Sequence, residues 1–214
     1  MERLRGKVAI VTGGAGGIGH AFARGLASEG ARVVIADMDE AGAGALASEL
    51  GGDALAFKLD VTSVESTQEL ARVALERFGR IDILVNTAAI YVTLERKPFA
   101  EIDLAEWNRI FAVDLTGSAL CARAVLPAMK QQGAGVIINM GSVNTHLVPE
   151  GRTHYNAAKA AVEALTRTLA RLRIPSPYGR GVTRANARVG VRVLDEDLAA
   201  IDHQDVAGDH ARVV

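Results

Sequence analysis

The sequence predicts an α/β fold in which a parallel β-sheet is covered by helices on both faces. Short apolar runs rich in valine and isoleucine alternate with longer helical patterns along most of the chain, as in a series of βα units. The runs are nearly continuous in apolar residues, which is typical of strands buried on both faces. A glycine-rich segment joins the first apolar run to the first helical pattern.

The expected elements follow one another in a regular order. Five apolar runs have strand length, and they cover residues 7–12, 32–37, 54–60, 81–86 and 135–142. Helices are expected between them, and they begin near Gly17, Glu40, Ser63 and Leu104. A further helix covers residues 154–170, and Pro175 and Pro177 are expected to end it. No repeat or linker interrupts this order, so residues 1–214 are predicted to form a single domain.

Composition excludes several classes of partner. A formal net charge of -1 gives neither a basic surface for nucleic acid nor a polybasic membrane surface. We expect no membrane partner, because no stretch looks long and apolar enough to cross a bilayer and the run Val8–Val11 is too short for a signal peptide. The single cysteine, Cys121, lies in an apolar helical stretch and is predicted to be a buried, inert thiol, which fits a cytoplasmic protein.

The segment "TGGAGGIG" follows the first strand and opens the first helix. Backbone N–H groups at a helix N-terminus attract phosphate, and glycines let the backbone approach it closely. Glycine clusters also occur in flexible loops, but the order of strand, loop and helix favours a dinucleotide site here. The candidate contacts are Thr12, Gly13, Gly17, Ile18 and Gly19.

Asp37, at the end of the second strand, is placed to accept hydrogen bonds from an adenosine ribose. The alternative is an acidic residue of a surface loop. A carboxylate here would repel the 2'-phosphate of NADP, and the following residues, "MDEAGAG", contain no arginine or lysine to neutralise it. The sequence therefore favours NAD over NADP as the cofactor.

Tyr155 and Lys159 lie four residues apart near the start of a helix, so they share one helical face. A phenol titrates at about 10 in water, and a nearby ammonium lowers that pKa. Such a tyrosine can take a proton from an alcohol while a hydride leaves for a nicotinamide. Ser142, at the end of the fifth strand, is a candidate to hold the substrate oxygen. The alternative for the pair alone is a solvated helix face.

Five motifs in order, "TGGAGGIG", "KLDV" (58–61), "NTAA" (86–89), "GS" (141–142) and "YNAAK" (155–159), resemble the compact branch of the short-chain dehydrogenase/reductases. The resemblance covers about residues 6–172. It implies a Rossmann-like, doubly wound sheet, no metal, and oxidation of an alcohol or reduction of a ketone.

The resemblance also implies roles for individual residues. Tyr155 would be the acid/base, Lys159 would bind the cofactor's ribose and lower the tyrosine pKa, and Ser142 would orient the substrate. Asp60 and Val61 would contact the adenine, and Asn86 would border the nicotinamide. Many members are tetramers, so we expect a dimer or tetramer built on helices near residues 104–132 and 153–172.

The chain departs from the family pattern at three positions of the core motifs. Thr87 and Ala89 replace an asparagine and a glycine, which is a mild change if the backbone there tolerates a Cβ. Asp114 stands where the family often has an asparagine that completes a proton relay. Either the relay is altered, because an ionised aspartate cannot donate a hydrogen bond, or Asp114 is only a tolerated helix residue.

Residues 173–214 diverge further. "RANA" (184–187) faintly resembles the family's sixth strand, and "RVG" (188–190) stands where the family usually has Pro-Gly. The short tail keeps open an alternative function, a dinucleotide-binding protein with weak or no turnover. His146 and His154 either touch a polar substrate or are ordinary loop and helix-start residues.

Overall fold

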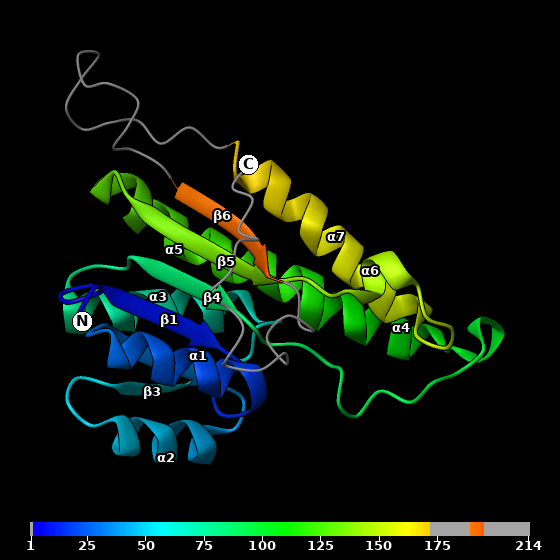
Figure 1. The fold of residues 1–214 in the computed structure, drawn as a ribbon, viewed down its shortest axis with the longest axis horizontal. Helices are drawn as coiled ribbons and strands as arrows, with labels where there is room; N and C mark the ends of the chain where they lie inside the picture. The colour runs from blue at the N-terminus through cyan, green and yellow to red at the C-terminus, as the bar shows by residue number, and fades with distance from the viewer. Residues whose placement is uncertain (1, 172–188, 195–214) are drawn as a thin grey trace, which may run out of the picture.

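The computed structural model describes residues 2–171 and 189–194, and their strands form one parallel sheet (Figure 1). The strand order is β3-β2-β1-β4-β5-β6. The strands are β1 Val8–Thr12, β2 Arg32–Asp37, β3 Leu55–Lys58, β4 Ile83–Asn86, β5 Gly135–Met140 and β6 Val189–Leu194. Every neighbouring pair is parallel, which confirms the predicted α/β, Rossmann-like architecture.

The helices begin where the sequence predicts them. They are α1 Gly17–Ser28, α2 Glu40–Leu50, α3 Val64–Phe78, α4 Leu104–Ile110, α5 Ser118–Gln132, α6 Asn144–Leu147 and α7 Thr153–Leu169. A 3-10 turn, η1, covers Phe99–Glu101, and a π-helical segment, η2, covers Phe111–Gly117 and makes α4 and α5 continuous. Ser63 does not begin α3 but caps it, because its Oγ accepts a hydrogen bond from the Ser66 N–H at 3.0 Å.

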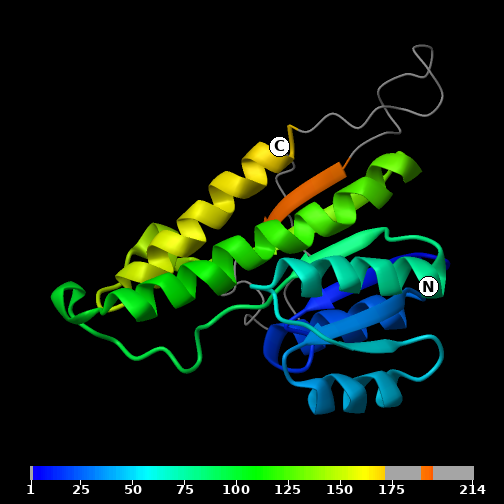
Figure 2. The same ribbon diagram turned by 180° about the vertical axis from the view of Figure 1, so that it is seen from behind.

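Two separate apolar layers hold the helices on the sheet. One layer joins β1, β2 and β4 to α1 and α2, which face the viewer in Figure 1. The other joins the opposite sheet face to α3 and α5, and Figure 2 shows these two helices from behind with α7 beside α5. Since both faces are covered, the strands need apolar residues at successive positions, as the sequence has them.

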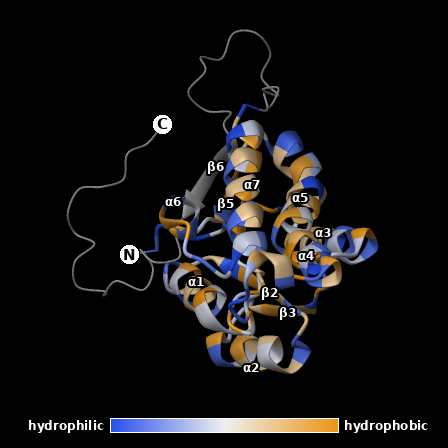
Figure 3. Ribbon diagram, turned by 90° about the vertical axis from the view of Figure 1, so that its right-hand side faces the viewer, coloured by the Kyte–Doolittle hydropathy of each residue, from blue (hydrophilic) through white to orange (hydrophobic). Residues whose placement is uncertain are grey.

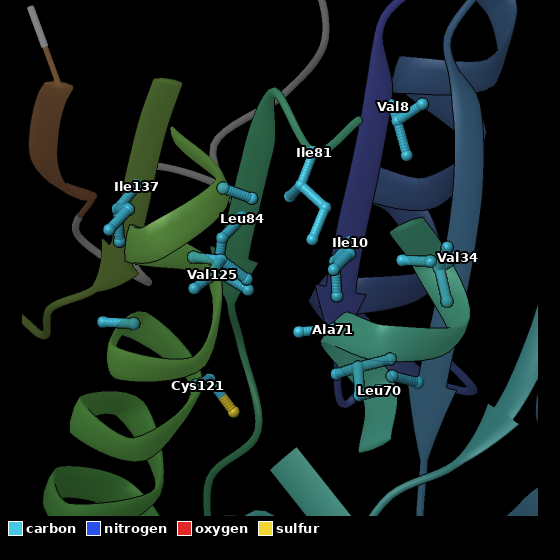
Figure 4. Close-up of a cluster of buried hydrophobic side chains, with 14 of the residues drawn as sticks. Val8, Ile10, Val34, Leu70, Ala71, Ile81, Leu84, Cys121, Val125 and Ile137 are labelled. Carbon is cyan, nitrogen blue, oxygen red and sulfur yellow. The ribbon is translucent and has the colours of Figure 1, made fainter. Parts of the chain in front are cut away.

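The second layer contains the largest buried apolar cluster (Figure 4). Strand residues Val8, Ile10, Val34, Leu84 and Ile137 belong to it, with helix residues Leu70, Ala71, Cys121 and Val125. Cys121 is 1% exposed, and burial raises the pKa of its thiol to about 12. The prediction of a buried, inert cysteine is confirmed.

One expectation about helices is wrong. The continuous helix Leu104–Gln132 is long and apolar enough to cross a membrane, by length and composition alone. Its apolar residues serve the core instead, since Cys121, Val125 and Met129 pack on the sheet. Figure 3 shows hydrophilic and hydrophobic residues alternating along α5 and α7. A core helix passes the same test as a membrane span, so this finding is weak support for a membrane segment.

The sixth strand also differs from the expectation. Strand β6, Val189–Leu194, pairs with β5 in parallel register, so the strand lies after the "RANA" segment and includes residues 189–190, at the position where the family usually has Pro-Gly. The physical reason is its valine-rich segment "VGVRVL", which suits a strand. The "RANA" segment, Pro175 and Pro177 lie outside the described residues.

The chain connections reverse direction between β1 and β4. Chain connections leave β1 toward β2 on one side and reach β4 on the other, and ligands of open α/β sheets bind at such a reversal. Thr12 and Asn86, the last residues of these strands, are direct neighbours in the sheet. Both were predicted site residues.

Asp82 ties the opposite, amino-terminal edge of the sheet together. Its carboxylate is 5% exposed and accepts hydrogen bonds from the Val8 N–H at 3.0 Å and from Arg80 at 2.6 and 2.7 Å. Burial alone raises the pKa of Asp82, but the hydrogen bonds from Arg80 and Val8 and the nearby cations bring it below its ordinary value.

We predict that Asp82→Asn lowers the free energy of unfolding by about 1–3 kcal/mol at neutral pH, because it removes the buried charge that accepts hydrogen bonds from the Val8 N–H and from the half-exposed Arg80. The folded-state pKa of Asp82 is depressed, so its contribution is present above the unfolded pKa of about 3.9 and is lost as pH falls through the folded value. Urea unfolding at several pH values measures this difference. Asp53→Asn, which breaks an exposed pair with Arg77, is the control. A loss at Asp82 no larger than at Asp53 would contradict the prediction.

Candidate active site

The glycine loop between β1 and α1 has a backbone that side chains would disturb. Gly13 and Gly17 have φ values of +65° and +53°, which favour glycine. A Cβ on Gly13 would lie 2.8 Å from the backbone of Ala88. A Cβ on Gly19 would overlap the carbonyl oxygen of Gly13, so α1 packs directly against the loop. The predicted glycines therefore form a cradle of bare backbone.

The N-terminus of α1 is suited to an anion. Gly16 occupies the N-cap position and makes no side-chain hydrogen bond to the helix, and the first turn contains no acidic residue. The first-turn N–H groups thus keep their attraction for a negative group. Ile18 is half-buried beside them. A pyrophosphate fits this donor set, and the residues present match a dinucleotide.

Asp37 lies at the end of β2 and faces the glycine loop. Its Oδ2 accepts a hydrogen bond from the Ala15 N–H at 3.0 Å, and its Oδ1 accepts one from the Asp39 N–H at 2.9 Å. Each carboxylate oxygen can accept a further bond, so the group remains able to receive ribose hydroxyls. The contact with the loop makes Asp37 part of the candidate cofactor site.

Asp60 and Val61 follow β3 and are held in place locally. The Asp60 Oδ1 accepts hydrogen bonds from the N–H and the hydroxyl of Thr62 at 2.8 and 2.6 Å. Val61 is 7% exposed, and a Cβ on Gly117 would lie 2.7 Å from its Cγ2. The glycine in η2 thus lets this helical segment approach the end of β3.

Thr12 joins the glycine loop to the segment after β4. Its carbonyl oxygen accepts a hydrogen bond from the Thr87 hydroxyl, and its Oγ1 accepts one from the Ala88 N–H at 3.3 Å. Among the described residues, Ala89 is not one of those with positive φ, so its Cβ needs no strained backbone. Both replacements in "NTAA" are compatible with the fold.

A buried polar network links Asn86 to the helix that carries Tyr155. The Asn86 amide donates to the Asn139 Oδ1 at 2.9 Å and to the Ser118 carbonyl at 3.2 Å. Asn139 in turn donates to the Thr166 hydroxyl at 2.9 Å. This chain of bonds connects β4, β5, α5 and α7, and it fixes the position of α7 over the sheet.

Lys159 and Tyr155 lie buried on the face of α7 that meets β5 and η2. Lys159 is 2% exposed, and its Nζ donates a hydrogen bond to the Met140 carbonyl at 3.2 Å. The same Nζ lies 5.6 Å from the centre of the Tyr155 ring. Tyr155 is fully buried, so a solvated helix face is excluded for both residues.

Asp114 is the anionic neighbour of this pair. It is 1% exposed in η2, and its Oδ2 lies 3.8 Å from the Lys159 Nζ. Its Oδ1 accepts a hydrogen bond from the Ile90 N–H at 3.0 Å. Asp114 therefore contacts both the lysine and the loop after β4. π-helical segments occur often at functional sites, and here one carries the carboxylate that faces Lys159.

Ser142 follows β5 directly and is 4% exposed. Its Oγ accepts a hydrogen bond from the Asn144 N–H at 3.2 Å, which fixes the side chain at the carboxyl end of the strand. The Lys159 Nζ contacts Met140 two residues earlier. Strand β5 therefore carries the serine and anchors the lysine.

The two histidines lie differently. His154 is fully buried, and its Nε2 lies 3.2 Å from the Glu106 Oε1 of α4. His146 is exposed on α6, with its Nε2 4.0 Å from a Glu163 oxygen. His154 thus joins α7 to α4, as expected of a helix-start residue.

Two residues beside Tyr155 were not identified from the sequence. The Tyr91 ring lies 4.9 Å from the Tyr155 ring, and the Arg152 guanidinium lies 4.3 Å from the centre of the Tyr91 ring. Tyr91 lies in the loop after β4 and belongs to none of the sequence motifs, so no pattern in the sequence singled it out. The sequence offered one sign of Arg152, which is that it is a cationic residue three positions before Tyr155.

Comparison with known proteins agrees with this geometry. Residues 7–176 match the family described as short chain dehydrogenase. The chain belongs to the short chain dehydrogenase family. Members of this family are oxidoreductases, and similar proteins are named as dehydrogenases of CH–OH groups.

Three short chain dehydrogenases illustrate the similarity. D-threitol dehydrogenase of Mycolicibacterium smegmatis is 40% identical over 197 residues, which cover 91% of this chain and 73% of that enzyme. Cis-4-hydroxycyclohexanecarboxylate dehydrogenase of Sinomonas cyclohexanicum is 42% identical over 172 residues, 79% of this chain and 68% of that enzyme. The 2,5-dichloro-2,5-cyclohexadiene-1,4-diol dehydrogenase of Sphingobium indicum is 40% identical over 172 residues, with the same coverage.

A crystal structure of a short chain dehydrogenase from Burkholderia phymatum in complex with NAD superposes with a TM-score of 0.78 at 34% identity. The match covers 91% of this chain and 66% of the Burkholderia protein, so this chain spans slightly less than two thirds of that protein's length.

The close packing at the glycine loop predicts that two glycine-to-alanine substitutions in α1 have different effects on NAD binding and on stability. We expect Gly19→Ala to weaken NAD binding by at least about tenfold and to destabilise the fold by about 1–3 kcal/mol, because the added methyl overlaps the Gly13 carbonyl. Gly25→Ala in the same helix meets open space and should stabilise by about 0.5–1 kcal/mol with unchanged NAD binding. Calorimetric titration and chemical unfolding measure both. Equal NAD affinity in the two variants would contradict the cradle.

Proposed function

We propose that this protein is an NAD-dependent oxidoreductase that interconverts a secondary alcohol and a ketone, with Tyr155 as the acid/base. One observation carries the proposal: a buried lysine on α7 reaches the carboxyl end of β5 and lies beside an equally buried tyrosine. Lysine is rarely buried in proteins unless it is paired, and buried titratable groups of this kind cluster at functional sites.

The chain's own residues account for cofactor binding. The glycine loop binds the pyrophosphate through backbone N–H groups, and Asp37 accepts hydrogen bonds from the adenosine ribose. Asp60 and Val61 border the adenine, and Asn86 borders the nicotinamide. When bound, NAD supplies a hydride acceptor. The negative charge of Asp37 supports NAD over NADP, and NAD is present in the similar Burkholderia structure.

Four side chains take part in removing the proton from the alcohol, either directly or through a neighbouring group. Tyr155 accepts the hydroxyl proton of the substrate, and the Lys159 ammonium favours the phenolate that this step requires. Ser142 holds the substrate oxygen through its hydroxyl. The Asp114 carboxylate pairs with the ammonium at 3.8 Å, and so acts on the tyrosine through the lysine.

The similar enzymes suggest the class of substrate. Their names specify a tetritol, a cyclic diol and a cyclic hydroxy acid, each a small alcohol with a further polar group. We propose a small secondary alcohol of this kind as the substrate. A panel of D-threitol, cyclohexane-1,4-diol and cis-4-hydroxycyclohexanecarboxylate, with NAD and the NADH absorbance band as readout, tests the activity.

A second candidate is a dinucleotide-binding protein with weak or no turnover. Its support is the complete burial of Tyr155, because an alcohol reaches this side chain only after a covering group moves. NAD binding without NADH formation on the whole panel supports this candidate, and turnover of any member supports the dehydrogenase.

We further propose a cytoplasmic homo-oligomer, a dimer or tetramer, built on the continuous helix Leu104–Gln132 and on α7. Phe99, in η1 just before that helix, and Leu104, its first residue, are 68% and 72% exposed, and a second copy of the chain would cover them. Light scattering of the purified protein measures the state.

Tyr155→Phe tests the acid/base assignment. The variant keeps the ring and loses the hydroxyl, so turnover should fall by about 10²–10⁴, the usual contribution of general acid/base catalysis. NAD affinity should change little. Steady-state kinetics and NAD titration measure the two quantities. Near-normal turnover in the variant would refute the role of Tyr155.

Asp37→Asn tests cofactor choice. The unchanged protein should bind NAD more tightly than NADP, because the carboxylate repels the 2'-phosphate. The neutral variant should narrow this gap, mainly by improved NADP binding. Titration of both cofactors at equal ionic strength provides the comparison, with Asp39→Asn as a neighbouring control. A starting preference for NADP would show that Asp37 has another role.

A further inference from the structure

We infer that Arg152 is a substrate-binding residue and that the preferred substrate is a secondary alcohol bearing a carboxylate. The inference rests on the proposed dehydrogenase function and names the substrate class of the same site. Its basis is an arginine that lies over Tyr91, the ring next to Tyr155, and whose buried Nε has no hydrogen-bond partner.

The Arg152 side chain contains a hydrogen-bond donor without an acceptor. Its Nε is buried and has no hydrogen-bond partner. In the part of the chain that the structure describes, no carboxylate forms an ion pair with its guanidinium, whereas Arg3, Arg80 and Arg167 each have one. A buried donor without an acceptor is unfavourable, more so when it belongs to a charged group. An anionic ligand would satisfy it.

The position of Arg152 connects it to Tyr155. Its guanidinium carbon lies 4.3 Å from the centre of the Tyr91 ring, and that ring lies 4.9 Å from the Tyr155 ring. Because both distances share the Tyr91 ring, the guanidinium carbon lies at most 9.2 Å from the centre of the Tyr155 ring. This upper limit is close to the length of a small hydroxy acid, so the inferred substrate has its hydroxyl at Tyr155 and its anionic group at Arg152.

The backbone around Arg152 is fixed. Its carbonyl accepts a hydrogen bond from the Asn156 N–H at 2.9 Å in the first turn of α7. The adjoining Gly151 carbonyl accepts one from the Lys97 N–H at 2.9 Å, which ties the start of α7 to the loop that carries Tyr91. Arginine and tyrosine thus sit on two joined segments. A planar guanidinium in a fixed position favours a carboxylate, which it can bind through two parallel N–H groups.

The test compares cis-4-hydroxycyclohexanecarboxylate with its methyl ester, which keeps the ring and the alcohol but lacks the charge. We expect kcat/KM to favour the acid over the ester by at least about tenfold. Arg152→Gln should reduce this ratio by about ten- to a hundredfold, and Arg152→Lys should restore only part of it, because lysine lacks the fork. Arg167→Gln, an exposed arginine on the same helix, should leave the ratio unchanged.

A binding measurement separates this inference from the proposed function. Cyclohexanecarboxylate has no alcohol to oxidise, and its affinity for the protein saturated with NADH is measured by calorimetry. Binding that is lost in Arg152→Gln but retained in Arg167→Gln supports the inference even if no alcohol is oxidised. Two results would overturn the inference even if neutral alcohols are oxidised. One is an equal kcat/KM for the acid and the ester in the unchanged protein, and the other is an affinity for cyclohexanecarboxylate that Arg152→Gln does not change.

Discussion

The placement of the Lys159 ammonium is the constraint on which the site depends. A buried ammonium is stable only with close acceptors and counter-charge, and this one has the Met140 carbonyl at 3.2 Å and the Asp114 carboxylate at 3.8 Å. These partners come from a strand and from a π-helical segment far apart in sequence. The lysine therefore takes its position only when α7, β5 and η2 are packed together, and Tyr155 on the same helix face is placed with it.

The rest of the fold supports this packing. The hydrogen bonds from Asn86 to Asn139 and from Asn139 to Thr166 join the central strands to α7 and give the buried amide nitrogens of both asparagines their acceptors. On the other side of β4, bare glycine backbone brings α1 against the carboxyl end of β1. The glycine loop and the tyrosine–lysine pair thus lie along the same edge of one sheet, the edge at which open α/β sheets bind their ligands.

Local sequence patterns were sufficient to predict most of the strands and helices. Continuous apolar runs predicted β1 to β5, and their parallel order placed Asp37, Asn86 and Ser142 at one edge. The family resemblance pointed to Asp114 as a relay position, but composition and periodicity did not predict its contact with Lys159, because a π-helical segment changes which residues face inward. Tyr91 contacts Tyr155, and Arg152 contacts Tyr91, through loop packing that leaves no periodic pattern in the sequence. The membrane-length apolar helix and β6 were misjudged for a related reason: burial and strand pairing depend on tertiary contacts.

The central claim is that one crevice holds a nicotinamide cofactor and an alcohol so that Tyr155 and Lys159 assist hydride transfer between them. The most direct measurement follows the hydrogen itself, with a substrate alcohol deuterated at its carbinol carbon and the reduced cofactor analysed by NMR. The account predicts deuterium at a single position of the nicotinamide ring, on one face only. A cofactor that binds but carries no deuterium after prolonged incubation with the deuterated alcohols of the panel would contradict it.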